Sequence, residues 1–166
     1  MIAPLLPADL EIRVITEAGD DSLTLEYELH SPNGRFELSH VSFPGGRLRR
    51  PEVWQERIFK TLRKLHRRRD SRDAALSREE VRTALAALGE DLSDELYPGE
   101  IQRTLQEVRQ AETVLLFSDE PWIPWEIVKP YDDGVCGEQE GGFLASQFQF
   151  TRWLAGETTP APGRPT

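Results

Sequence analysis

The sequence contains a single cysteine, Cys136, among 166 residues, so an internal disulfide framework is excluded. A lone cysteine fits a reducing compartment, and we expect the cytoplasm. No apolar run approaches the roughly 20 residues that a membrane-spanning helix needs. The opening MIAPLLPADL also lacks the basic segment and the long apolar segment of a signal peptide. We therefore expect a cytoplasmic protein without membrane contact.

Lysine is scarce, with 3 of the 20 basic residues, and the net charge is −9. Against that background, residues 47–82 carry 13 Lys/Arg and 6 Asp/Glu. Such a segment could contact a nucleotide or nucleic acid, and the candidate contacts are Arg49, Arg50, Arg67, Arg68 and Arg69. It could equally be a solvated helix face. The interleaved acids and the overall negative charge favour the solvated face and disfavour nucleic acid as a partner.

The first fifty residues predict an antiparallel β layer. Apolar and polar residues alternate over 10–14 and 23–29, as in strands with one buried face. Asn33-Gly34 is a hairpin signal. We expect a third strand over residues 35–43, in which a shift of the apolar register predicts a bulge, followed by a turn at 44–47.

Three helices are expected next. Trp54, Ile58, Leu62 and Leu65 follow Pro51 at helical spacing, and residues 66–74 predict an exposed loop. Ser77 and Glu80 form a capping box for the second helix, with a hydrophobic staple from residue 76 to residue 81. Gly89 predicts a kink or break in that helix, and Pro98 begins the third.

Consecutive apolar residues at 113–117 predict a strand covered on both faces, as in a parallel sheet. We expect the segment 143–153 to pair with it in parallel, across a loop at 131–142. The predicted fold is thus mixed α/β, an α+β arrangement. Its parts are a β-hairpin layer (1–50), helices with the first parallel strands (51–156), and a linker or disordered tail (157–166).

The stretch SDEPWIPWEIVKP follows the apolar strand, where α/β proteins often build sites. Asp119 and Glu120 could serve acid–base or metal chemistry. Alternatively, Ser118 or Asp119 caps a short helix, and Trp122 and Trp125 anchor the turn. We favour the second interpretation because the chain offers no matching ligands. We expect neither a metal site nor a cofactor.

Residues 90–154 contain four elements in a fixed order: a Leu-x-Pro segment, an acidic turn, a Pro-aromatic-Glu motif and a later strand. They correspond here to Leu96–Pro98, to Asp119 and Glu120, to Pro124, Trp125 and Glu126, and to Phe143 and Leu144. This region resembles the front of the CHAT domain, a caspase-like module. The resemblance implies that the Pro-aromatic-Glu motif is structural, with the aromatic ring under the sheet and the glutamate holding the turn.

The family's catalytic His-Gly and Cys elements follow the matched region, so the resemblance implies no catalytic residue in this chain. His30, His40 and His66 lie in other contexts, and acidic neighbours of Cys136 disfavour its thiolate. The first hypothesis is a non-catalytic interaction or regulatory module in a bacterial conflict or cell-death system. The second is the substrate-pocket half of a cysteine protease whose dyad lies downstream or on another chain. The third is a nucleotide or nucleic-acid sensor that uses residues 47–82.

The expected partner follows from the sheet. If no further strand follows the predicted parallel pair, the sheet keeps an unpaired edge and an uncovered apolar face. We therefore expect a homodimer, or a partner protein or downstream segment that completes the sheet.

Overall fold

A computed structural model describes residues 7–70, 78–129 and 142–154, with the side chains of 67–70 left out. The strands are β1 (Leu10–Gly19), β2 (Ser22–His30), β3 (Val41–Arg49), β4 (Thr113–Ser118) and β5 (Gln149–Leu154). The helices are α1 (Pro51–Asp70), α2 (Arg78–Leu96), α3 (Gly99–Glu107), the 3-10 helix η1 (Trp125–Ile127) and α4 (Leu144–Gln147). The predicted mixed α/β class is confirmed.

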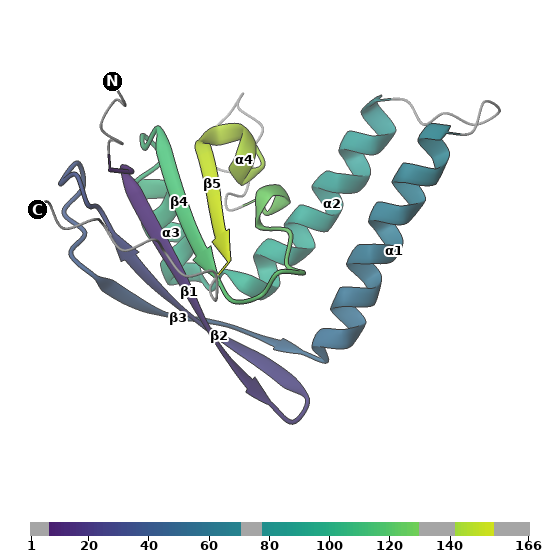
Figure 1. The fold of residues 1–166 in the computed structure, drawn as a ribbon, viewed down its shortest axis with the longest axis horizontal. Coiled ribbons are helices and arrows are strands. Elements are labelled where there is room, and N and C mark those ends of the chain that lie inside the picture. The colour runs from purple at the N-terminus through teal and green to yellow at the C-terminus, as the bar shows by residue number, and fades with distance from the viewer. Residues whose placement is uncertain (1–6, 71–77, 130–141, 155–166) are drawn as a thin grey trace, which may run out of the picture.

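The five strands form one mixed sheet in the order β3-β2-β1-β4-β5. β1 to β3 are antiparallel neighbours, while β4 runs parallel to both β1 and β5. The predicted parallel pairing is confirmed for Gln149–Leu154, whereas residues 144–147 of the predicted segment form helix α4 instead of strand. Because β1 pairs with β4, the N-terminal hairpins and the parallel strands share one sheet (Figure 1).

The core lies on one face of this sheet. Alternate residues of β1, β2 and β4 are buried there against Leu88, Leu92 and Leu96 of α2 and Ile101 and Leu105 of α3. Tyr27 crosses this interface and donates its hydroxyl to the carbonyl of Leu96 at 2.9 Å. In Figure 1, α3 lies behind β1 and β4, and α1 and α2 stand beside the sheet.

The prediction that residues 113–117 are covered on both faces is wrong for the described part of the chain. Val114 and Leu116 are buried, whereas Leu115 and Phe117 stay partly exposed on the face that no described helix covers. Both faces of the strand are apolar, but only one of them faces the helices.

The third strand and the first helix differ from their predicted limits. β3 begins at Val41 and includes residues 44–47, which were predicted as a turn. Gly45 and Gly46 form an irregularity between the pairs Thr24–Arg47 and Glu26–Pro44, opposite Leu25. Helix α1 continues to Asp70 instead of ending before an exposed loop at residue 66. Arg-rich sequences retain good helix propensity, which explains the longer helix.

Gly89 does not break α2, which is continuous from Arg78 to Leu96. A Cβ at this position would meet the Ile127 carbonyl oxygen at 2.1 Å. The Gly89 carbonyl also accepts a hydrogen bond of 3.2 Å from the Lys129 N–H. The glycine allows the chain after η1 to approach the helix backbone. The predicted capping box and staple include residues 76 and 77, which lie outside the described residues.

Candidate interaction site at the edge of the sheet

The turn after β4 is built around Trp125. Its indole is fully buried and lies against the rings of Tyr27 and Tyr97, at centroid distances of 6.3 and 6.2 Å. The indole Nε1 donates to the Ser118 hydroxyl at 3.1 Å, which satisfies the one polar atom of the side chain. The geometry agrees with an anchoring role for the ring beneath the sheet.

Ser118 and Asp119 do not cap the short helix as one interpretation expected. The residue before η1 is Pro124, and no side chain caps this helix. The Ser118 hydroxyl instead accepts from the Glu120 N–H at 3.2 Å and from the Trp125 indole. Asp119 is exposed. The Glu120 carboxylate accepts a hydrogen bond of 2.6 Å from the Trp122 indole.

Arg152 of β5 fastens this turn to the sheet. Its Nη2 donates to the Glu120 carbonyl at 2.7 Å, and its Nη1 lies 3.6 Å from a carboxylate oxygen of Glu126. The Arg152 side chain is 15% exposed, and its Nε has no hydrogen-bond partner among the described residues. Sequence analysis gave Arg152 no role, because the turn that it contacts is about thirty residues away in the chain.

The outer edge of β5 is one of the two unpaired edges of the described sheet, and β3 forms the other. The Gln149 N–H donates to the Glu112 carbonyl at 2.7 Å, so this peptide group faces β4. Successive residues of a strand direct their N–H and C=O groups to opposite edges. Those of Phe150, Arg152 and Leu154 therefore point away from β4, where no described strand lies.

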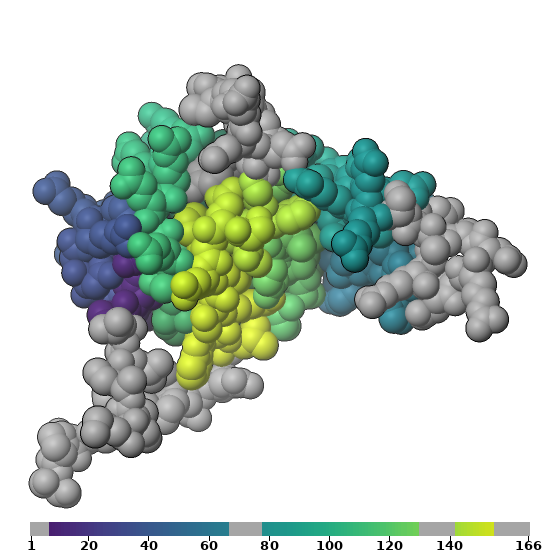
Figure 2. All heavy atoms as spheres, turned by 90° about the horizontal axis from the view of Figure 1, so that it is seen from above, coloured from purple at the N-terminus to yellow at the C-terminus, as the bar shows by residue number. Residues whose placement is uncertain are grey.

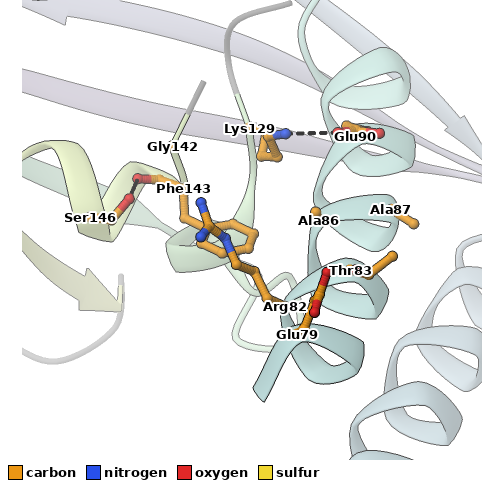
Figure 3. Close-up of a pocket in the computed structure, with 10 residues that line it drawn as sticks. All are labelled: Glu79, Arg82, Thr83, Ala86, Ala87, Glu90, Lys129, Gly142, Phe143 and Ser146. Carbon is orange, nitrogen blue, oxygen red and sulfur yellow. Dashed lines mark hydrogen bonds and ion pairs between the residues drawn. The ribbon is translucent and has the colours of Figure 1, made fainter. Parts of the chain in front are cut away.

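A pocket of about 590 Å³ lies between α2 and the start of α4 (Figure 3). Its lining residues are Glu79, Arg82, Thr83, Ala86, Ala87, Glu90, Lys129, Gly142, Phe143 and Ser146. Lys129 is 8% exposed, and its Nζ pairs with Glu90 at 2.7 Å. This ion pair joins α2 to the segment after η1, beside the Gly89 contact. In Figure 2, β5 and α4 form a continuous surface.

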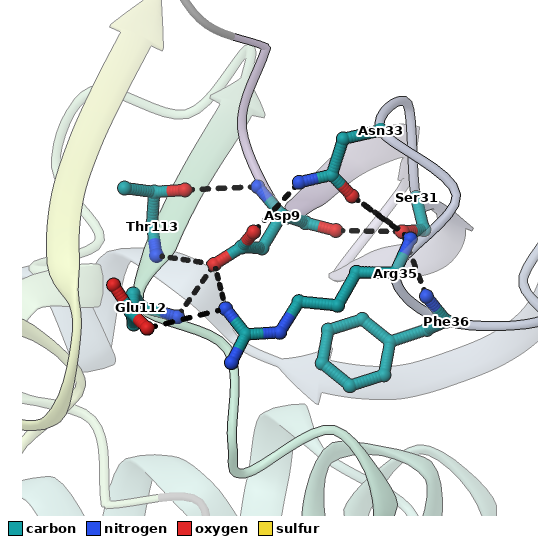
Figure 4. A network of polar contacts seen from close by, with 7 residues as sticks. All are labelled: Asp9, Ser31, Asn33, Arg35, Phe36, Glu112 and Thr113. Atoms are coloured by element: carbon teal, nitrogen blue, oxygen red, sulfur yellow. Dashed lines mark hydrogen bonds and ion pairs between the residues drawn. The ribbon is translucent and has the colours of Figure 1, made fainter.

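At the end of the sheet where β1 and β4 begin, Asp9 holds three segments together (Figure 4). One carboxylate oxygen accepts from the backbone N–H groups of Glu112 and Thr113 at 2.7 and 3.2 Å. Asn33 and Arg35 also donate to the carboxylate, at 2.7 and 3.0 Å. Burial alone raises the pKa of Asp9, but these hydrogen bonds and the Arg35 charge outweigh it and lower the pKa to about 2. Sequence analysis missed this cluster.

The candidate arginines for polyanion binding do not form one patch. Arg49 and Arg50 are exposed at the end of β3, before α1 begins. Arg67, Arg68 and Arg69 lie near the C-terminal end of α1. At 1.5 Å per helical residue, the two groups of backbone positions are about 25 Å apart.

The remaining candidate positions also lie apart. His30 and His40 stack with their ring centroids 4.2 Å apart, and His66 is exposed on α1. Cys136 and the predicted loop and tail lie outside the described residues. Within the described ranges, no group of three or more His, Cys, Asp or Glu side chains could hold a metal ion.

Comparisons with known proteins found no match among family models, curated proteins or solved structures. No described helix is long and apolar enough to cross a membrane.

Proposed function

We propose that this chain is a protein-interaction module that receives a strand from a partner at the outer edge of β5. On the CHAT resemblance, it is the non-catalytic N-terminal portion of a caspase-like protein with a regulatory role in a bacterial conflict or cell-death system. Its single cysteine fits a cytoplasmic setting. The observation that carries the proposal is the row of outward-facing peptide groups on β5.

Several features make this edge suited to strand addition. β5 is six residues long and contains no proline, so no residue within it lacks a backbone donor. Leu154, at its end, is 37% exposed. Natural sheets usually protect an edge with charges, prolines or a covering element. The charged residue of β5, Arg152, directs its guanidinium to the turn after β4, which leaves the outward-facing peptide groups unprotected by charge.

The neighbouring turn gives the edge a fixed shape. Arg152 joins β5 to Glu120, and Trp125 anchors the same turn in the core. A partner strand would therefore meet a preorganised edge, which lowers the entropic cost of association. Main-chain hydrogen bonds would supply affinity, and the side chains along β5 would supply selectivity.

A matched pair of variants tests this role. Leu154→Pro removes an outward-facing N–H, whereas Leu154→Ala shortens the same side chain and keeps the donor. Both variants and the wild type are immobilised as baits, and the retention of a partner is compared among the three. In a separate measurement, amide hydrogen exchange is followed on the isolated chain. We expect the amides of Phe150, Arg152 and Leu154 to exchange faster than those of Thr151 and Trp153.

A partner retained by the wild type and by Leu154→Ala, but lost by Leu154→Pro, supports strand addition. Retention that is equal on all three baits contradicts it. Protection of the three outward-facing amides in a strictly monomeric chain also contradicts it, because the edge would then be already paired.

A further inference from the structure

The face of the sheet opposite the helices, here called the open face, is aligned in rows across the strands. Strand pairing places Glu28, Arg13, Phe117 and Trp153 side by side on β2, β1, β4 and β5. The Arg13 guanidinium lies 5.7 Å from the centre of the Phe117 ring, which confirms that the two side chains share a face. A second row contains Glu11, Leu115 and Thr151.

This face is divided into two chemically different halves. On β4 and β5 it carries no charge, and its residues are Thr113, Leu115, Phe117, Gln149, Thr151 and Trp153. On β1 and β2, alternation places Glu11, Glu17, Glu26 and Glu28 on the same face, together with the cation Arg13. The edge strand β3 adds Arg47 and Arg49 to this face, opposite Thr24 and Ser22, on the side of β2 away from β4. No ion pair between described residues involves these four glutamates. Ile15, 39% exposed, lies opposite Glu26 within the acidic half.

The dimensions of the face match those of a helix. Neighbouring strands lie about 4.8 Å apart, and a helix with its side chains is about 10 Å wide. A helix over β4 and β5 would cover Leu115, Phe117 and Trp153. Long basic side chains on its flank would extend over β1 toward the acids of β1 and β2. Parallel strands are ordinarily covered by helices on both faces. A helix on the open face of β1, β4 and β5 would complete this usual arrangement.

We propose that the open face binds an amphipathic helix of a partner protein whose apolar stripe is flanked on one side by lysine or arginine. The apolar half would bury the stripe, and the glutamates of β1 and β2 would face the basic flank. This extends the interaction role proposed above to a second surface, separate from the outer edge of β5.

A second copy of the chain offers a poorer match. Its most exposed helix is α1, whose exposed apolar residues Val53 and Phe59 are six positions apart. At about 100° per residue they lie about 120° apart around the helix, so they do not form one stripe. The charge pattern of the open face is therefore better complemented by a different protein.

The test uses two designed helical peptides of about 18 residues, long enough to span the strands. Both carry the same leucine stripe, flanked by lysine in one peptide and by glutamate in the other. Binding is measured by fluorescence anisotropy of the labelled peptides at low ionic strength. We expect the wild type to prefer the lysine peptide by about three- to tenfold, the range of a few exposed charge contacts.

Two variants and their controls locate the contact. Phe117→Thr replaces the ring by another residue that favours strands, and it should weaken the binding of both peptides at least tenfold. The double variant Glu26→Lys/Glu28→Lys should reverse the preference between peptides. Glu56→Lys/Glu107→Lys, which changes the net charge equally on exposed helix positions, should keep the wild-type preference. Leu154→Pro should leave peptide binding unchanged, which separates this proposal from strand addition.

Equal binding of the two peptides, or insensitivity to Phe117→Thr in a folded protein, would overturn the proposal. Sedimentation of the chain alone gives a further check. Self-association that Phe117→Thr abolishes would show that the face is occupied by a second copy, which also overturns it.

Discussion

The indole N–H of Trp125 donates to the hydroxyl of Ser118, seven residues earlier, at 3.1 Å. Ser118 ends β4, and Trp125 begins the short helix that returns beneath the sheet. Both residues are completely buried. The bond therefore closes the turn around a large apolar ring and leaves no unpaired indole donor.

Trp125→Ala should lower the free energy of unfolding by about 3–5 kcal/mol, because it removes a fully buried ring that packs against Tyr27 and Tyr97. Trp122→Ala is the matched control, since Trp122 is only partly buried, and its loss should be smaller. Urea denaturation followed by far-UV circular dichroism measures both. Equal losses would mean that Trp125 is not the anchor of the turn.

Ser118→Ala tests the bond itself. It leaves the buried indole N–H without its acceptor, which should cost about 1–3 kcal/mol, less than loss of the ring. The same urea titration gives the value. A Ser118→Ala protein as stable as wild type would show that the bond contributes nothing beyond the packing of the ring.

Asp9 should make stability depend on acid pH. Its pKa falls from 3.8 to about 2 on folding, so its contribution is fully present above pH 4 and is lost as the pH falls through 2. The shift corresponds to about 2 kcal/mol. In Asp9→Asn this contribution should be missing at pH 7. The free energy of unfolding of this variant should also fall less steeply than that of the wild type as the pH is lowered below 4. Glu112→Gln is the control, because the Glu112 carboxylate is 74% exposed. An unchanged slope in Asp9→Asn would contradict the assignment.

Local patterns predicted the parts of this fold that depend on near neighbours. Alternation identified β1 and β2, and the consecutive apolar residues identified β4. The contacts of Asp9 join residues more than one hundred positions apart, and no local pattern encodes such a distance. Gly46 was interpreted as part of a turn because glycine usually signals one. In the structure Gly46 allows β3 to pack closely against α2, because a Cβ at this position would lie 1.8 Å from the Glu95 carbonyl oxygen.

Gly89→Ala should destabilise the protein although alanine is the better helix former. The helix propensity gain is about 1 kcal/mol. The added Cβ, however, would meet the Ile127 carbonyl oxygen at 2.1 Å, and overpacking of this kind costs about 1–3 kcal/mol. Gly99→Ala, where a Cβ would meet nothing within 4 Å, is the control and should be neutral or stabilising. Thermal melts of the two proteins should shift in different directions, and a raised melting temperature in Gly89→Ala would show that the close contact is absent.

Arg152 makes two contacts that mutation can separate. Its hydrogen bond to the Glu120 carbonyl is 2.7 Å long, while its ion pair with Glu126 is longer, at 3.6 Å, and involves a carboxylate that is 43% exposed. Glu126→Gln should therefore cost less than about 1 kcal/mol. Arg152→Ala should cost about 1–3 kcal/mol, because it removes the donor to the carbonyl and the packing of the side-chain stem. Chemical denaturation of both variants gives the two values. If Glu126→Gln is as destabilising as Arg152→Ala, the carboxylate rather than the backbone carbonyl holds β5 to the turn, and Arg152→Lys should then restore most of the lost stability.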